Sequence, residues 1–299
     1  MSDRSLFFYG TSGRSALLIH GLSGTPAEMI FQAKRLNRHG YTVSVPQLAG
    51  HCQDDAALLA TRWEDWYVSV ESAYERLKEE TDEVSVAGIC VGGALGLVLA
   101  SRHSDVRAAA VYSMIFDYDG WNMPRWYALA PVMSLANVLP PLNRIQFEEP
   151  YPFGLKDARL RERLQSKSEV MMDGALTHMS LGSLRQMRRL VAHVRDVSPS
   201  IRQPVLVVHS TEDDMAHPRN SEALVKILGG PTELLLLKDS YHMIHIDKER
   251  NLVADRTASF FDAAARGAAY LSGKGLDGSL YGKKQSHNVT PQFPNGATK

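Results

Sequence analysis

A chain of 299 residues is long enough for one large α/β domain or for two smaller domains. Hydrophobic residues make up 44% of the chain and charged residues 22%, which is typical of a globular protein with a sizeable core. The 33 Lys and Arg residues balance the 33 Asp and Glu residues, so no broad basic field is present to attract nucleic acid or an anionic membrane.

The N-terminal residues lack the features of a signal peptide, because residues 1–8 contain only three apolar residues after Met1. No apolar run approaches the roughly 20 residues needed to span a bilayer. We therefore expect a soluble, cytoplasmic protein without stable membrane insertion. Two cysteines, Cys52 and Cys90, are too few for a disulfide framework. No pattern in the sequence indicates an oligomeric state.

Short apolar runs alternate with helix-length amphipathic stretches along the chain. The runs are rich in Val and Leu with little polar alternation, which predicts strands buried on both faces of a parallel sheet. These strands are predicted over residues 16–19, 42–45, 84–87, 108–112, 205–209 and 233–237. Helices are predicted between and after them, over residues 26–38, 63–80, 91–102, 221–228 and 248–264. The alternation indicates a mostly parallel central sheet flanked by helices.

The segment after the fourth predicted strand breaks this rhythm. Residues 114–199 contain tryptophans, methionines and Pro-rich stretches without an evident strand, and we expect a mainly helical insertion over the carboxyl edge of the sheet. Its last helix, over about residues 183–194, leads back to the core. The core then comprises residues 1–113 and 200–268. Residues 269–299, rich in Gly, Ser, Lys, Asn and Pro, are expected to form a disordered tail.

The most informative motif is Gly-Ile-Cys-Val-Gly-Gly at residues 88–93. It lies between a predicted strand and a predicted helix, which is the context of a G-x-S-x-G nucleophile elbow with Cys in place of Ser. Flanking glycines let the backbone pass close to a sharp turn, and the helix N-terminus favours a thiolate over a thiol. Cys90 is therefore the candidate nucleophile; the alternative is a buried, inert thiol beside a Gly-rich turn.

Two later loops supply the partners that such a nucleophile needs. On this type of fold the chain order is nucleophile, acid, histidine. The loop after the fifth predicted strand contains Asp213, our candidate acid, with Asp214 as its rival. The loop after the sixth contains His242, the candidate general base, with His245 as a competitor. We therefore predict a triad of Cys90, His242 and Asp213.

The early segment Leu-Leu-Ile-His-Gly-Leu-Ser-Gly at residues 17–24 fits a loop that supplies hydrogen-bond donors to a tetrahedral oxyanion. The predicted donors are the backbone N–H groups of Leu22 and Val91. We expect His20 to brace this loop rather than to transfer protons. No set of His, Cys and Asp residues has metal-ligand spacing, and no nucleotide-binding Gly motif is present, so neither a metal nor a cofactor is expected.

The insertion suggests residues that contact the substrate. Trp121, Met123 and Trp126 are predicted to line an apolar groove; the alternative is that they pack the insertion onto the core. A row of arginines follows later in the insertion. We interpret it as a solvated helix face, with an anionic carrier such as coenzyme A as the alternative partner; it consists of Arg185, Arg188 and Arg189.

Taken together, the motifs resemble the carboxylesterase and monoacylglycerol-lipase-like branch of the α/β-hydrolase superfamily. The matching pieces occur in the expected order across about residues 15–265, and they lie at residues 20–22, 49–51, 88–93, 209–213 and 240–247. The resemblance implies the α/β-hydrolase fold, with the insertion as its lid. The Gly-x-Cys-x-Gly-Gly elbow departs from the usual Ser and is instead similar to the elbows of dienelactone hydrolases and polyhydroxyalkanoate synthases.

The function expected on these grounds is hydrolysis of an ester, thioester or lactone through an acyl-Cys90 intermediate. A thioester also accepts amines, thiols and carbanions, so the alternative is an acyltransferase that passes the acyl group to a small-molecule acceptor. A third hypothesis is a non-catalytic binding protein that keeps the fold. The expected partner is a small-molecule acyl substrate, with acyl-thioesters among the candidates.

Overall fold

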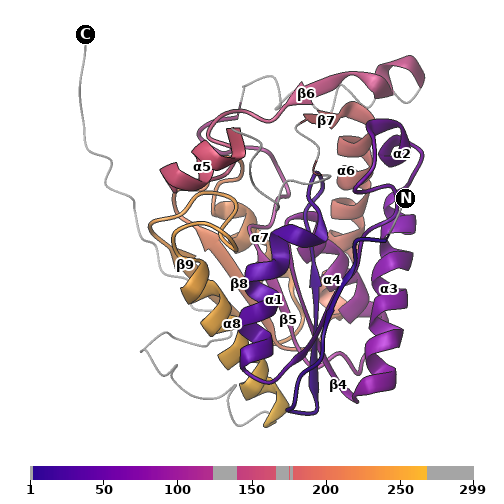
Figure 1. Ribbon diagram of the computed structural model, residues 1–299, viewed down its shortest axis with the longest axis vertical. Coiled ribbons are helices and arrows are strands. Elements are labelled where there is room, and N and C mark those ends of the chain that lie inside the picture. The colour runs from indigo at the N-terminus through magenta and orange to yellow at the C-terminus, as the bar shows by residue number, and fades with distance from the viewer. Residues whose placement is uncertain (1–2, 124–139, 166–174, 176–177, 268–299) are drawn as a thin grey trace.

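The computed structural model describes residues 3–123, 140–165, 175 and 178–267, and it has a central sheet with helices packed on both faces (Figure 1). The sheet consists of β1 (Leu6–Phe8), β2 (Arg14–Ile19), β3 (Thr42–Val45), β4 (Glu83–Ile89), β5 (Ala109–Tyr112), β8 (Val205–Ser210) and β9 (Thr232–Leu237). Its strand order is β1-β3-β2-β4-β5-β8-β9. Only β1 is antiparallel to its neighbour, which confirms the predicted mostly parallel sheet.

The central strands are buried on both faces, as their apolar sequences predict. Every residue of β3, β5 and β8 is buried, and so are all but the first residue of β2 and β4. β9 is less buried because it is an edge strand with one neighbour. The sequence did not indicate β1, which has three residues and is too short to show a period.

Two groups of helices cover the sheet (Figure 1). α1 (Ile30–Arg38) and α8 (Arg250–Ala265) pack against each other, whereas α4 (Val91–Arg102) packs against both α3 (Trp63–Glu80) and α6 (Leu181–Val197). α4 is apolar on all sides because it lies among the strands and these two helices. α7 (Arg219–Ile227) connects β8 to β9. Among the described helices, none combines the length and the apolar composition that crossing a bilayer requires.

The insertion contains a small sheet that the sequence did not reveal. Its described elements are η4 (Pro140–Arg144), β6 (Gln146–Glu148), α5 (Ala158–Gln165) and β7 (His178–Ser180), and β6 pairs antiparallel with β7. Three-residue strands are too short to show alternation. α6, which we placed at the end of the insertion, packs on α4 and α3 and so joins the helix layer of the core. The predicted tail at residues 269–299 lies outside the described residues.

A short helix on the core holds the insertion in place. α2 (Asp55–Leu59) begins after Asp54, whose side chain caps it by accepting from the amide of Ala57. The carboxylate of Asp55 accepts from Gln146 Nε2 at 2.6 Å and contacts Nε2 of His178. These contacts fasten β6 and β7 above the carboxyl edge of the main sheet.

Candidate active site

The candidate residues meet at the carboxyl edge of the sheet. Cys90 directly follows β4, Asp213 follows β8, and His242 follows β9. These strands run parallel and lie within four adjacent positions of the sheet, in the order β4-β5-β8-β9. Because parallel strands end on the same side, three segments that are far apart in the chain reach one place.

Cys90 occupies a strained turn between β4 and α4. Its φ of 51° and ψ of −112° are unfavourable for a residue with a Cβ atom. Two backbone hydrogen bonds hold the turn: the Cys90 amide donates to the carbonyl of Tyr112 at 2.9 Å, and its carbonyl accepts from the amide of Ala94 at 3.0 Å. The side chain is 8% exposed. The turn therefore places the sulfur beyond the carboxyl end of β4, at the N-terminus of α4.

The imidazole of His242 lies between Asp213 and Cys90. Its Nδ1 is 2.8 Å from Oδ2 of Asp213, and the ring also forms a hydrogen bond with the Cys90 side chain. Because Nδ1 is hydrogen-bonded to Asp213, Nε2 is the nitrogen that faces the sulfur. Burial alone would lower the pKa of His242, but the carboxylate of Asp213 and the sulfur of Cys90 outweigh it and hold this pKa well above its usual value. The structure thus brings the three predicted residues together.

Asp213 is fixed as an anion by donors on both oxygens. Its Oδ1 accepts from the amides of Met215 and Ala216, at 2.9 and 2.8 Å, while Oδ2 faces His242. His209 Nε2 lies 3.3 Å from the same Oδ2. Burial would raise the pKa of Asp213, yet these partners, His242 foremost, bring it below its ordinary value. A charged carboxylate is therefore available to orient the imidazole.

Asp214, the rival candidate, faces the backbone instead of the imidazole. Its Oδ1 accepts from the amide of His242 at 3.3 Å, and its Oδ2 accepts from the amide of Gly154 at 3.2 Å. Burial and the adjacent charge of Asp213 raise the pKa of Asp214 to about 6. Ser113, which sequence reasoning missed, donates its hydroxyl to the carbonyl of His242 at 2.7 Å. Asp214 and Ser113 therefore position the histidine through its main chain.

The other histidines near the site are buried and neutral. His20 Nδ1 donates to the carbonyl of Gly21 at 3.0 Å, and its Nε2 accepts from the amide of Leu48 at 3.3 Å. Burial lowers the pKa of His20 to about 3, which agrees with a bracing role. His245 is buried as well, and burial lowers its pKa to about 3. Its Nε2 lies 3.9 Å from Oε1 of Glu28, and His245 is not among the residues that line the cavity beside Cys90.

The predicted oxyanion loop is held by a glutamate that the sequence did not single out. Glu28, in η1 (Pro26–Met29), accepts from the amide of Gly21 at 2.7 Å through Oε1. The amide of Leu22 donates no hydrogen bond within the described part of the chain, and Leu22 lines the same cavity as Cys90. The Val91 amide lies in the first turn of α4, where no helical acceptor exists. Both predicted donors are therefore available.

The sulfur opens into a narrow cavity of about 70 Å³. Its walls are mainly apolar, and the side chains that line it beyond the oxyanion loop include Ile115, Tyr118, Phe153, Leu164, Met179, Met215 and Met243. Two acidic residues, Glu28 and Glu149, also line it. A cavity of this kind can hold an acyl group against Cys90 while most water is excluded.

Trp121 and Met123, which we expected to line a substrate groove, lie outside this cavity. Trp121 is 61% exposed, and its Nε1 donates to the carbonyl of Glu212 at 3.0 Å. The amide of Gly120 donates to the carbonyl of Met215, which aligns this segment with the loop after β8 and turns Trp121 outward. Met123 packs against the hydrophobic core, the alternative reading of these residues. Trp126 lies outside the described residues.

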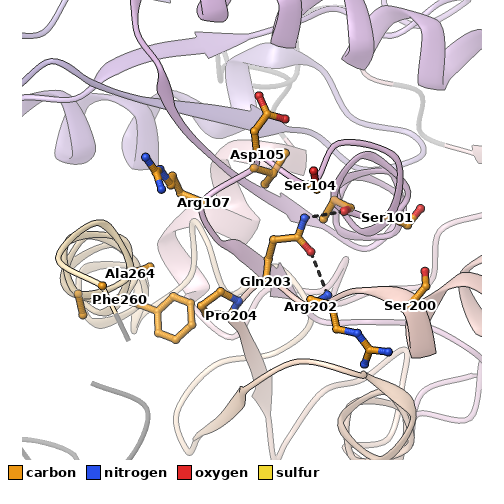
Figure 2. Close-up of a pocket in the computed structure, with 14 residues that line it drawn as sticks. Ser101, Ser104, Asp105, Arg107, Ser200, Arg202, Gln203, Pro204, Phe260 and Ala264 are labelled. Carbon is orange, nitrogen blue, oxygen red and sulfur yellow. Dashed lines mark hydrogen bonds between the residues drawn. The ribbon is translucent and has the colours of Figure 1, made fainter. Parts of the chain in front are cut away.

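A larger cavity of about 430 Å³ lies at the opposite edge of the sheet (Figure 2). Arg107 precedes β5, and the segment from Arg202 to Pro204 precedes β8, so this cavity adjoins the amino ends of the strands. Gln203 Nε2 donates to the carbonyl of Ala100 at 2.8 Å and closes one side. The cavity contains none of the candidate residues, and ligands of parallel α/β sheets bind at the carboxyl edge.

Two other sequence features do not contribute to the cavity beside Cys90. The predicted arginine row lies along α6, where Arg189 pairs with Glu64 at 3.0 Å, and none of its three members lines the cavity. Neither Cys52 nor Cys90 takes part in a disulfide. Cys90 alone of the two lines the cavity.

Replacing Glu28 by glutamine is expected to reduce the pH dependence of stability. Burial raises the Glu28 pKa from 4.5 to about 7, so between these values the folded protein keeps a proton that the unfolded chain has lost. Wild-type stability therefore decreases as pH rises through this window. The free energy of unfolding of Glu28→Gln minus that of the wild type should increase by on the order of 2 to 3 kcal/mol from about pH 4.5 to about pH 8, as measured by urea unfolding. If this difference is the same at both pH values, the carboxyl group of Glu28 is not buried in its protonated form.

Comparisons with known proteins identify similar lipases and esterases. The chain is 28% identical over 256 residues to the thermostable monoacylglycerol lipase of Bacillus sp. (strain H-257), covering 85% of this chain and 93% of that protein. It is 25% identical over 261 residues to a carboxylesterase of Bacillus subtilis (strain 168), and this match covers 86% of this chain and 95% of the carboxylesterase. A solved structure from the metagenome-derived lipolytic enzymes LipS and LipT matches with a TM-score of 0.72 and 24% identity, and the match covers 87% of this chain and 97% of that one.

The family match covers most of the sheet and every predicted member of the triad. Residues 13–249 match the family described as serine aminopeptidase, S33, which includes the elbow and both later loops. The match to the solved structure covers 87% of this chain and shows the α/β-hydrolase fold. The chain therefore belongs to the Hydrolase_4 family of α/β-hydrolases, described as serine aminopeptidase, S33.

Proposed function

We propose that the protein is an acyl hydrolase that carries the acyl group on the sulfur of Cys90. The observation that carries this proposal is the continuous contact from Asp213 through His242 to Cys90, with the sulfur lining a cavity. The relatives named as a monoacylglycerol lipase and a carboxylesterase support an ester as substrate. The family description names serine, whereas this chain has Cys90 at the elbow.

The geometry supports a two-step reaction. In the first step the Cys90 thiolate attacks the carbonyl carbon of the substrate, and the amides of Leu22 and Val91 stabilise the oxygen that becomes negative. The C–O or C–S bond to the leaving group then breaks, and His242 gives that group its proton. In the second step water loses a proton to His242 and attacks the thioester, and Cys90 leaves as the thiolate. Asp213 stabilises the imidazolium in both steps.

A sulfur nucleophile changes the second step. A thioester reacts readily with amines and thiols, so acyl transfer to a small acceptor competes with hydrolysis. Product analysis in the presence of amine, alcohol and thiol acceptors separates the two reactions. Free acid as the sole product across the three acceptor classes identifies a hydrolase, and acylated acceptor identifies an acyltransferase.

Replacing Cys90 by alanine is expected to abolish both acylation and turnover. Wild-type protein incubated with short-chain p-nitrophenyl esters and acyl thioesters should gain the mass of one acyl group, and peptide mapping should place that mass on Cys90. Turnover of the esters should fall by at least about 10³-fold in Cys90→Ala, because the covalent route is lost.

The second cysteine provides the matched control. Cys52→Ser removes a buried thiol that does not line the cavity, and it should keep acylation of Cys90. If Cys90→Ala turns over esters as fast as the wild type, the proposed nucleophile is wrong. If no substrate in the panel leaves an acyl group on Cys90 and none is turned over, the covalent mechanism is wrong.

A further inference from the structure

The part of the insertion that precedes α5 contacts the loop of the candidate general base. It consists of residues 154–157, which we call the bridging segment; it lies beside the loop that follows β9 and leads into α5 (Figure 1). The carbonyl of Gly154 accepts from the amide of Met243, one position after His242, at 2.8 Å. No residue of the bridging segment lines the cavity beside Cys90, so the segment can act on the chemistry only through other residues.

A buried carboxylate, Asp247, joins the bridging segment to the same loop. Its Oδ2 accepts from the amides of Tyr241 and Lys156, each at 2.8 Å. Its Oδ1 accepts from the amide of Asp157 at 2.8 Å. Asp247 is fully buried, and hydrogen bonds to a carboxylate are shorter and stronger than those between neutral groups. One side chain therefore holds two amides of the insertion and the amide that directly precedes His242.

Every amide from residue 241 to residue 243 depends on the bridging segment. The first donates to Asp247, which also holds the segment. The second, that of His242, donates to Asp214 at 3.3 Å, and the other oxygen of Asp214 accepts from the amide of Gly154 at 3.2 Å. The third donates directly to the carbonyl of Gly154. The main chain of His242 is therefore fixed to the insertion at its own position and on both sides.

Gly154 also lies against the side chain of the histidine. Its φ is 70°, and a Cβ atom there would lie 3.2 Å from Cβ of His242 and 2.8 Å from Cγ of Met243. The imidazole is attached to that Cβ of His242, and it must reach both Asp213 and Cys90. A shift of a few tenths of an ångström at this atom therefore disturbs both contacts.

The ion pairs of the same segment are secondary. Lys156 Nζ contacts Glu212, in the loop after β8, and lies 2.8 Å from Oδ1 of Asp239, in the loop after β9. Both carboxylates are partly exposed, and ion pairs in such positions contribute little to stability. The buried main-chain hydrogen bonds are therefore the main connection between the insertion and the loop of His242.

We propose that Asp247 and the bridging segment position the imidazole of His242 for proton transfer with Cys90. The insertion then takes part in catalysis and does not merely cover the cavity. Asp247 is a positioning residue, because it acts through the main chain beside His242 and does not line the cavity. This inference rests on the proposed function, to which the proton transfer belongs, but the position of the ring also affects the thiol when no substrate is present.

Gly154→Ala tests the contact between the bridging segment and the histidine. The reaction of Cys90 with iodoacetamide near neutral pH should slow by at least about fivefold, because a displaced imidazolium stabilises the thiolate less. The kcat for p-nitrophenyl butyrate should fall by about ten- to a hundredfold. Mass spectrometry with peptide mapping follows alkylation at Cys90 alone, and urea unfolding verifies that the variant is folded.

A glycine far from the site provides the matched control. Gly13 also has a φ of 70°, but a Cβ atom there would meet no atom within 4 Å. Gly13→Ala therefore introduces the same backbone strain without the contact, and it should leave the alkylation rate and kcat within about twofold of the wild type. If Gly154→Ala changes these two rates no more than Gly13→Ala does, the bridging segment does not position the histidine.

Asp247→Asn tests the buried carboxylate. The oxygen of the asparagine should replace Oδ2, which has two donors, so its NH₂ group faces the amide of Asp157 and this bond to the bridging segment is lost. The kcat should fall about tenfold and the alkylation rate of Cys90 at least about threefold. KM should stay within about threefold, because the cavity lining is unchanged.

A second carboxylate in the same region is the control for this variant. Glu249 accepts from the amides of Lys238 and Asp239, and none of its hydrogen bonds within the described part of the chain reaches the bridging segment. Glu249→Gln should keep kcat and the alkylation rate within about twofold. An equal loss in Glu249→Gln and Asp247→Asn would show that the loop as a whole, and not its connection to the insertion, positions the histidine, and it would overturn the inference.

The two measurements separate this inference from the proposed function, because alkylation requires no substrate. If Cys90→Ala turns over the ester as fast as the wild type while Gly154→Ala and Asp247→Asn slow alkylation more than their controls do, the proposed function falls and the positioning role stands. If turnover depends on Cys90 and neither variant differs from its control, the proposed function stands and this inference falls.

Discussion

Replacing Asp213 by asparagine is expected to lower kcat for ester turnover by about 10³- to 10⁴-fold while leaving the fold intact. Oδ1 of Asp213 is fixed by the amides of Met215 and Ala216. The oxygen of an asparagine must therefore take that place, and its NH₂ group must face Nδ1 of His242. Nδ1 then becomes an acceptor and Nε2 carries the hydrogen. In this tautomer the imidazole cannot take a proton from Cys90.

The rate of thiol modification checks the same change without a substrate. Because the Asp213 carboxylate helps to hold the His242 pKa well above its usual value, its removal should weaken the imidazolium beside Cys90 and slow the reaction of Cys90 with iodoacetamide near neutral pH. Glu212→Gln, which removes a half-buried carboxylate one position earlier in the chain that pairs with Lys156, is the control and should change kcat by less than about threefold. A loss in Asp213→Asn no larger than that in the control would show that Asp213 does not orient the histidine.

Replacing Gly92 by alanine is expected to reduce the free energy of unfolding by about 3 kcal/mol and to abolish acylation of Cys90. A Cβ atom at Gly92 would lie 2.2 Å from the carbonyl oxygen of Ile19 and 2.6 Å from that of His20. These are backbone atoms of β2 and of the start of the oxyanion loop, so no side-chain rotation relieves the overlap. α4 must move away from the strand, and the Cys90 turn moves with it. Urea unfolding and intact-mass acylation measure the two effects.

The same helix contains a matched control. A Cβ atom at Gly96 would meet the side chain of Val86 at 3.1 Å, which a small rotation of the valine can relieve. Alanine is also the better helix former by about 1 kcal/mol, so Gly96→Ala should change the free energy of unfolding by less than about 1 kcal/mol. Equal destabilisation by both replacements would show that the close approach of α4 to β2 is not what requires Gly92.

Local patterns were sufficient to locate the elements that carry the site. The predicted ranges 42–45, 63–80 and 91–102 coincide with β3, α3 and α4. These predictions succeed because the apolar pattern of a strand buried on both faces, or of a helix with one apolar side, is visible within a contiguous stretch of sequence. The elbow at Cys90 was visible for the same reason, since its glycines, its strand and its helix are contiguous. Short elements such as β6 and β7 have too few residues for a period to show.

The choice between adjacent acidic residues required the fold. Asp213 and Asp214 are indistinguishable in a loop of unknown geometry. The turn that follows places two amides on Asp213 and directs its second oxygen to His242, while Asp214 points to the main chain on the other side. The sequence supported Asp213 only through its position in the loop.

The sequence by itself determined which reactive side chain follows which strand: a thiol follows one strand, carboxylates follow a second, and a histidine follows a third. It did so because contiguous residues record local backbone structure and because parallel strands end on one side. Only the tertiary structure decided which side chains face the sulfur. It turned Trp121 to the surface and brought Glu28 and Glu149 into the cavity, since these orientations depend on hydrogen bonds and packing between segments far apart in the chain.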